Sequence, residues 1–124
     1  MTAIPLQFAD VVAANFPKHN PRGHEQEGYR PAIVVGFPSR IGIPRFSSVI
    51  VIPLTTDRGQ TWAIASPDLY PCFPAGFAGL RKPSIALLDQ LRVLDVNRII
   101  EYRGSLTDEQ YAPILSGLQR LIGP

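Results

Sequence analysis

One stretch of the sequence brings together acidic, amide and guanidinium groups of the kinds that act on phosphates. Residues 23–31 read Gly-His-Glu-Gln-Glu-Gly-Tyr-Arg-Pro, and Arg30 stands at the entrance of an apolar run. A guanidinium held there can clamp a phosphate and stabilise charge that develops on it, while Glu25 could orient the guanidinium or exchange a proton. The structural alternative is a surface salt bridge from Arg30 to Glu25 or Glu27.

Two hydroxyl groups follow a second apolar run. Thr55 and Thr56 come directly after Ile52-Pro53-Leu54. Hydroxyls at the end of a strand often cap turns. They can also donate to a phosphoryl oxygen when a cation lies within reach, so their interpretation depends on whether Arg30 is close in the fold.

The other reactive side chains are few. His19 and His24 lie five residues apart in a polar segment, where they could act as an acid–base pair on RNA or simply be solvated. Together with Cys72 they are too scattered for a zinc site, and no phosphate-loop or dinucleotide fingerprint is present. We therefore expect no metal and no cofactor. Ten of the twelve cationic residues are Arg, which suits phosphate binding or reflects codon usage.

Length and composition limit the class of protein that must position these groups. With 124 residues, 45% hydrophobic and 18% charged, we expect a single globular domain over residues 1–124. The single cysteine excludes an intramolecular disulfide and fits a cytoplasmic protein. The longest apolar stretches, residues 32–37 and 49–54, are too short to span a bilayer, so we expect no membrane association.

The ten glycines and thirteen prolines are spread along the chain, which favours short strands over long helices. Apolar, β-branched runs predict strands at residues 8–15, 32–35, 48–52, 61–65 and 98–104. A polar loop is expected at residues 17–29, and residues 66–83 should be irregular. The pattern of residues 84–94 fits both a helical face and strand alternation.

One helix is predicted at the C-terminal end. Thr107-x-x-Gln110 is a capping-box signature, and the apolar residues from Tyr111 to Ile122 follow at helical spacing. Pro113 counts against a regular first turn, and Gly123 is a natural stop. These elements together predict a small, strongly bent antiparallel sheet or partial barrel, with the helix covering an open end or edge.

In combination, these pieces resemble the MazF/PemK family, the toxin half of bacterial toxin–antitoxin pairs. The matching pieces are residues 9–12, 23–26, 28–35, 51–56 and 86–95, then Arg98 and Gly104. The Gly-x-Glu-Gln cluster that leads to Arg-Pro, the Pro-x-Thr-Thr strand end and the Asp-Gln-Leu-Arg segment occur in the family's order. Residues 1–7 and 57–83 match poorly.

The resemblance implies a mainly β fold, an SH3-like small β-barrel of the CcdB/MazF type with a C-terminal helix, in which residues 84–94 form a strand. It also implies a growth-inhibiting, metal-independent, sequence-selective endoribonuclease that cleaves single-stranded RNA, including mRNA, as a homodimer. The expected partner is a cognate antitoxin that lays an extended acidic segment across the RNA groove.

By position in the family's motifs, Arg30 and Thr55 are the expected catalytic pair, leaving 2′,3′-cyclic phosphate and 5′-hydroxyl ends. The expected substrate-binding residues, also by resemblance, are His24, Glu25, Gln26, Thr56 and Gln90. Two positions depart from the family. His24 stands where many relatives carry a small hydroxyl residue, and Ala9 replaces a common glycine, which bears on backbone geometry more than on activity.

Two other functions stay open. One is a non-catalytic inhibitor of the CcdB type that binds a protein target such as gyrase, although such proteins lack the Gly-x-Glu-Gln and Arg-Pro loop. The other is an inactive nucleic-acid-binding barrel. Four aromatic side chains could stack on bases, though each could equally serve packing: Phe16, Tyr29, Phe46 and Trp62.

Overall fold

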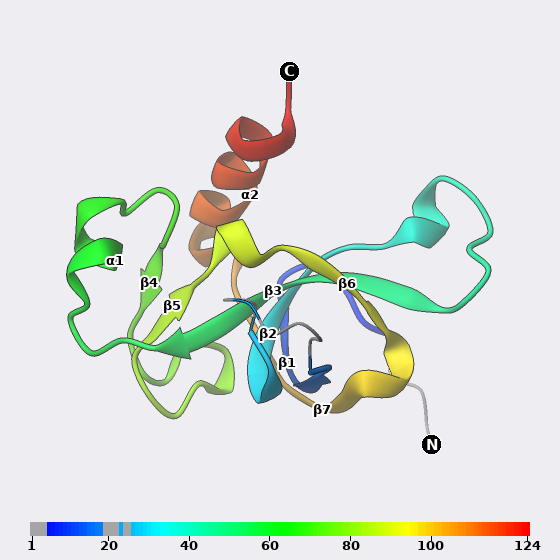
Figure 1. The fold of residues 1–124 in the computed structure, drawn as a ribbon, viewed down its shortest axis with the longest axis horizontal. Coiled ribbons are helices and arrows are strands. Elements are labelled where there is room, and N and C mark those ends of the chain that lie inside the picture. The colour runs from blue at the N-terminus through cyan, green and yellow to red at the C-terminus, as the bar shows by residue number, and fades with distance from the viewer. Residues whose placement is uncertain (1–4, 19–22, 24–25) are drawn as a thin grey trace.

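The structure, a computed structural model, describes residues 5–18, 23 and 26–124. Its main feature is an antiparallel sheet in the order β4-β5-β3-β2-β1-β7, with β6 also paired to β3 (Figure 1). The strands are β1 (Asp10–Phe16), β2 (Gly28–Gly36), β3 (Ser48–Thr56), β4 (Cys72–Phe73), β5 (Ser84–Ala86), β6 (Arg92–Asp95) and β7 (Ile99–Ser105). The helices are α1 (Thr61–Ala65) and α2 (Asp108–Ile122). Short 3-10 turns are η1 (Pro38–Arg40), η2 (Phe77–Gly79), η3 (Leu88–Gln90) and η4 (Val96–Arg98).

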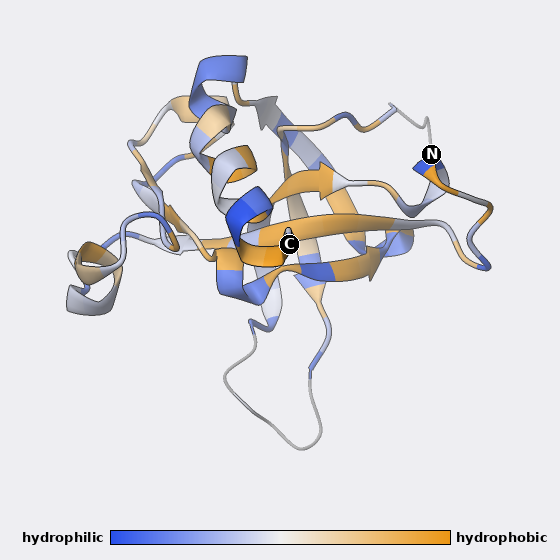
Figure 2. Ribbon diagram, turned by 90° about the horizontal axis from the view of Figure 1, so that it is seen from above, coloured by the Kyte–Doolittle hydropathy of each residue, from blue (hydrophilic) through white to orange (hydrophobic). Residues whose placement is uncertain are grey.

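The central strands are buried on both faces. Along β2, Ile33 belongs to one apolar cluster and Val34 to another, because successive side chains of a strand point to opposite faces. The first cluster includes Leu54 of β3 and Ile114 of α2, and the second includes Val51 of β3. Figure 2 shows the apolar residues concentrated in the strands and the polar residues in the connections. The bent sheet thus carries one of these two apolar clusters on each face, and a third, smaller cluster contains Ala63, Ile85 and Leu87. This arrangement confirms the prediction of a strongly bent sheet with a C-terminal helix.

Strand β3 organises the molecule because three strands pair with it. Its first half pairs with β6, its middle with β2, and its last residues, Leu54 to Thr56, with β5. The ladder between β2 and β3 ends at the pair Ala32 and Pro53. Pro31 and Pro53, which cannot donate a backbone hydrogen bond, lie at this point. Beyond it, β2 pairs with β1 alone while β3 pairs with β5, so the two strands separate.

The structure confirms the strands predicted near residues 8–15, 32–35, 48–52 and 98–104, with shifted or longer bounds. It confirms the C-terminal helix too, with both bonds of the capping box between Thr107 and Gln110. Pro113 lies inside a continuous helix, and Gly123 caps its end without adopting a left-handed conformation.

The prediction of a strand at residues 61–65 is wrong, because this segment is the short helix α1. Local polar bonds fix the turn that leads into it: Gly59 N donates to Asp57 Oδ1, and Gln60 Nε2 donates to the carbonyl of Thr56. The preference of β-branched and aromatic residues for strands depends on how their side chains pack, so the context can override it. Trp62 packs instead edge-to-face on Tyr70, with ring centroids 4.8 Å apart.

The single strand implied for residues 84–94 is also corrected. The segment forms two short strands, β5 and β6, separated by η3. Both lie along the same strand β3, but Leu87 N donates to the carbonyl of Pro53 and Leu88 N to that of Leu69, so the chain leaves the ladder between them. Residues 66–83 are irregular as expected, apart from β4 and η2.

Ala9 adopts a left-handed conformation, with φ of 74°, directly before β1. Its backbone N–H donates to Val34 and its carbonyl accepts from Leu106, so the surrounding strands hold this conformation. The expectation that the alanine here bears on backbone geometry is confirmed. Within the described ranges, no helix is both long and apolar enough to cross a membrane.

Candidate active site

Arg30 and Thr55 lie on β2 and β3 just past the point where these two strands stop pairing. The pairing of β2 with β3 ends at Ala32 and Pro53, so no backbone hydrogen bonds between these two strands join the segments that carry Arg30 and Thr55. The separation leaves an open site at the start of β2 and the end of β3.

A groove of about 550 Å³ occupies this opening. Its lining residues come from β2, β3, the turn after β3, the irregular segment before β5, β5 and β7. They are Tyr29, Arg30, Pro31, Leu54, Thr55, Thr56, Arg58, Gly79, Leu80, Arg81, Lys82, Ser84 and Arg103. Five of these side chains are cationic and none is a carboxylate, so the groove suits an anionic ligand.

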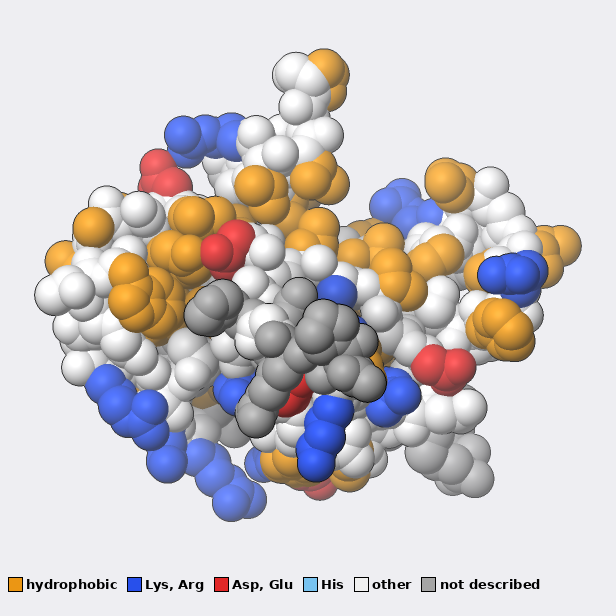
Figure 3. Space-filling view, viewed as in Figure 1, with side chains coloured by type: hydrophobic (Ala, Val, Ile, Leu, Met, Phe, Trp, Pro, Cys, Tyr) orange, Lys and Arg blue, Asp and Glu red, His pale blue; other side chains and the backbone are white. Residues whose placement is uncertain are grey.

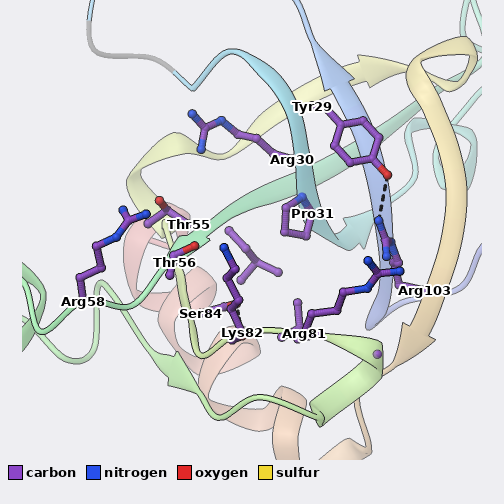
Figure 4. Close-up of a pocket in the computed structure, with 13 residues that line it drawn as sticks. Tyr29, Arg30, Pro31, Thr55, Thr56, Arg58, Arg81, Lys82, Ser84 and Arg103 are labelled. Atoms are coloured by element: carbon purple, nitrogen blue, oxygen red, sulfur yellow. Dashed lines mark hydrogen bonds between the residues drawn. The ribbon is translucent and has the colours of Figure 1, made fainter.

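Arg30 is held by the backbone that precedes it. Its Nε donates to the carbonyl oxygen of Glu27 at 2.8 Å, and the residue is half-buried. The acceptor is thus a main-chain oxygen of Glu27, and Glu25 lies outside the described residues. Figure 4 shows the guanidinium extending over the groove on the side of Thr55 and Arg58. The terminal nitrogens of Arg30 are thus placed where an anion in the groove can reach them.

Thr55 and Thr56 supply hydroxyls at the end of β3. Both are half-buried, and neither hydroxyl has a hydrogen-bond partner within the described part of the chain. The backbone beyond them is fixed, since Asp57 N donates to the carbonyl of Pro83 at 2.8 Å. The Arg58 side chain reaches back toward Thr55 in Figure 4. Two hydroxyls and two guanidinium groups in this position can together donate hydrogen bonds to the oxygens of one phosphate.

Four of the five cationic residues that line the groove were not identified as site residues from the sequence. Arg81 and Lys82 lie in the segment regarded as irregular, Arg58 follows the Thr-Thr pair, and Arg103 belongs to β7. The adjacent residues Arg81 and Lys82 were the feature of the sequence from which a cationic surface could have been predicted. Figure 3 shows Lys and Arg side chains gathered along one edge of the face in view.

The structure brings together Arg30, Thr55 and Thr56 but not every expected site residue. Gln26 and Gln90 are half-buried and do not line the groove. The carbonyl of Gln26 accepts a 3.4 Å hydrogen bond from Arg92 Nη1, and Gln90 ends η3. His24 and Glu25 lie outside the described residues. In the chain as described, no cluster of three or more His, Cys, Asp or Glu side chains could hold a metal ion.

The sequence was also compared with models of protein families. The model of the family described as "PemK-like, MazF-like toxin of type II toxin-antitoxin system" matches residues 7–122. A search of the curated proteins found no match.

Solved structures share the fold over nearly the whole chain. The crystal structure of MazF (Form-I) from Deinococcus radiodurans is similar with a TM-score of 0.73 and 23% identity, over 98% of this chain and 100% of that one. The MazE–MazF structure (Form-II) from the same organism has a TM-score of 0.65 and 25% identity, over 95% and 96% of the chains. An endoribonuclease in complex with its cognate antitoxin, from a mycobacterial species, has a TM-score of 0.65 and 18% identity, over 97% and 96%.

Proposed function

Because this chain belongs to the family of PemK-like, MazF-like toxins of type II toxin–antitoxin systems, we propose that it is a metal-independent, sequence-selective endoribonuclease that cleaves single-stranded RNA. One observation carries the proposal. Arg30 of β2 and Thr55 of β3 line one groove at the point where the two strands separate, and the groove is lined by five cations and no carboxylate. That arrangement suits a phosphodiester with its two flanking nucleotides.

The proposed reaction is a displacement at phosphorus within one strand of RNA. The ribose 2′-oxygen forms a bond to the adjacent phosphorus, and the bond from phosphorus to the 5′-oxygen of the next nucleotide breaks. The 2′-hydroxyl proton passes to a base and the leaving 5′-oxygen takes up a proton, so the products are a 2′,3′-cyclic phosphate and a 5′-hydroxyl. Since the nucleophile belongs to the substrate, alignment and stabilisation of charge can supply most of the rate enhancement.

In this mechanism Arg30 and Thr55 bind the phosphate most strongly in the transition state. The phosphorane carries additional negative charge, which a fixed guanidinium stabilises, and the Thr55 hydroxyl donates to a non-bridging oxygen. A guanidinium stays protonated at neutral pH and is therefore a poor base, so the role proposed for Arg30 is mainly electrostatic. Glu25 or His24 is the proposed proton acceptor, and Gln26, Thr56 and Gln90 are proposed as supporting contacts.

The same groove would serve inhibition by an antitoxin. An acidic, extended segment of a cognate antitoxin would be attracted by the five cations that line the groove and would exclude RNA from them. Relatives have been solved with their antitoxins, which supports a partner of this class. We also propose that the active form is a homodimer.

The test is to incubate the purified protein with a long single-stranded RNA in excess EDTA and to map the ends of the fragments. Discrete cuts that leave cyclic phosphates and 5′-hydroxyls are expected, and they would reveal the preferred sequence. Arg30→Ala prepared in parallel controls for a contaminating nuclease. RNA that stays intact with folded, antitoxin-free wild-type protein would overturn the proposal in favour of an inhibitor of a protein target or a binding module.

A further inference from the structure

Tyr29 is an exposed aromatic side chain inside the cationic groove. It is 54% exposed and lines the groove together with Arg81 and Arg103. The other three aromatic candidates for base stacking lie elsewhere: Phe16 is buried, and Phe46 and Trp62 are exposed outside the groove. An exposed aromatic ring among cations is the arrangement with which proteins bind single-stranded nucleic acids, since every base has a face that can stack.

The ring of Tyr29 is held in place by a neighbouring strand. Arg103 Nη2 donates to the Tyr29 hydroxyl at 2.8 Å, and the same nitrogen lies 3.0 Å from Glu101 Oε1. The Arg103 side chain is only 21% exposed, whereas Tyr29 and Glu101 are about half exposed, so Arg103 is the more buried member of this group. Figure 4 shows the hydroxyl of Tyr29 directed toward Arg103. A ring fixed at its hydroxyl loses less freedom when a base stacks on it.

Strand β7 carries a β-bulge at Arg103. Val11 is opposite Gly104 and the next residue, Val12, is opposite Tyr102, so Arg103 is the extra residue of the bulge. Bulges redirect a side chain and are frequent beside active sites. Arg103 is one of the residues that line the groove, so its side chain is placed there and not in the core.

The alternation of β2 relates this ring to the proposed reaction centre. Tyr29 and Arg30 are consecutive, so their side chains point to opposite faces of the strand, as Figure 4 shows. Arg30 extends on the side of Thr55, whereas Tyr29 lies on the side of Arg81 and Arg103. A nucleotide chain that crosses Pro31 from one side to the other would present a phosphate at Arg30 and an adjacent base at Tyr29.

We infer that Tyr29 is the stacking platform for the nucleobase next to the cleaved phosphate, and that Arg103, paired with Glu101, is the positioning residue that orients its ring. This inference rests on the proposed function, because it assigns a base-binding subsite to the same groove. It predicts that Tyr29 contributes to affinity at one nucleotide position only.

The experiment uses 2′-O-methyl RNA, which lacks the attacking hydroxyl and stays intact on the protein. The oligonucleotide is built around the mapped cleavage site, or is oligo(U) if the wild type cuts no RNA, and one base at a time is removed. Loss of one base should weaken wild-type binding about 10-fold. Tyr29→Ala should bind the complete oligonucleotide about 10-fold more weakly and be insensitive to loss of that base. Unchanged sensitivity in Tyr29→Ala at every position overturns the inference.

Arg103 variants test the positioning role. Arg103→Met should reduce the sensitivity at that one position about 3-fold, the size of one hydrogen bond, with unchanged thermal stability. Arg103→Lys should restore it, because an ammonium can also donate to the tyrosine hydroxyl. Phe46→Ala removes an exposed ring outside the groove and should retain the wild-type pattern. An Arg103→Met variant that binds all oligonucleotides with equally reduced affinity would show a general charge effect and overturn the positioning role.

The endoribonuclease function and the role of Tyr29 as a base platform can be disproved independently of each other. If the wild type leaves ordinary RNA intact but shows the position-specific loss with Tyr29→Ala, the endoribonuclease function fails and the base platform stands. If RNA is cleaved and Tyr29→Ala keeps its sensitivity at every position, the function stands and the platform fails.

Discussion

The two walls of the groove are built differently. One wall, here called the strand wall, consists of Arg30 on β2 with Thr55 and Thr56 on β3. The other, the loop wall, consists of residues 79–82, which precede β5. The strand wall continues directly into strands whose inner residues are fully buried. The loop wall is attached through a turn with three left-handed residues, Gly76, Ala78 and Gly79.

This difference matches what each wall would contribute to catalysis. Hydrogen bonds to a transition state weaken steeply when distance and angle change, so their donors belong on rigid elements. Coulomb attraction between a cation and a phosphate falls slowly with distance and tolerates movement. We therefore expect the strand wall to supply precisely placed hydrogen-bond donors and the loop wall to supply positive charge. Substitutions on each wall can test this division.

The largest effect is expected on the strand wall. Arg30→Ala should lower the rate of RNA cleavage by about 10³-fold, because the charge on the phosphorane loses its fixed guanidinium. Single-turnover cleavage at saturating protein measures this rate. Arg45→Ala is the matched control, since Arg45 is exposed outside the groove beside Phe46. Cleavage by Arg30→Ala within about 10-fold of wild type would remove Arg30 from the mechanism.

Thr55→Ala should lower the same rate by about 10²-fold with little change in RNA affinity, because its hydroxyl contact forms chiefly in the transition state. Thr55→Ser keeps the hydroxyl and should retain most of the activity. A loss shared equally by both variants would mean that the methyl group, and therefore packing, is what matters.

The strand wall was largely predictable from sequence and the loop wall was not. Runs of β-branched residues identified β2 and β3, and the motif positions then placed Arg30 and Thr55 at their ends. The loop wall depends on the positive φ of Ala78 and on the β-bulge at Arg103, neither of which follows from residue type. Helix α1 was missed for a related reason: the turn that leads into it is fixed by local hydrogen bonds around Asp57, which the composition of residues 61–65 does not reveal.

The attachment of the loop wall should be sensitive to a single methyl group. Gly79 has φ of 74°, and a Cβ there would clash with the carbonyl oxygen of Arg103. Gly79→Ala should therefore reduce the free energy of unfolding by about 2 kcal/mol, measured by urea denaturation. Gly76→Ala is the control, because φ is also positive but the space is open, and it should cost about 1 kcal/mol. Equal losses of unfolding free energy in the two variants would mean that the close approach of Gly79 to the Arg103 carbonyl does not hold the loop wall in place.

The charges of the loop wall should govern affinity and its salt dependence. Replacing Arg81 and Lys82 together by Ala should weaken binding of 2′-O-methyl RNA about 10-fold and leave the single-turnover rate at saturation unchanged. The slope of log affinity against log salt should fall by about 0.7 for each phosphate that the variant no longer neutralises. Arg120→Ala, on the exposed face of α2, is the control and should keep the wild-type slope. A changed cleavage rate at saturation would break the division between the walls.

The smallest effect concerns the bond that ties the chain after α1 to η3. The Tyr70 hydroxyl donates to Asp89 Oδ2 at 2.6 Å, and this bond, followed by burial, raises the pKa of Tyr70 to about 12. Tyr70→Phe should lower the free energy of unfolding by less than about 1 kcal/mol, because the pair is accessible to solvent.

The pH dependence of that small difference follows from its sign. The raised pKa means that the folded state favours the neutral phenol, so the contribution is complete below the unfolded pKa of about 10 and is lost as pH rises toward 12. Urea unfolding of wild type and Tyr70→Phe should therefore differ by the same amount at about pH 7 and pH 9, and by less at about pH 11. A difference that grows with pH would mean that the hydroxyl stabilises the fold in its ionised form, contrary to a bond donated to a carboxylate.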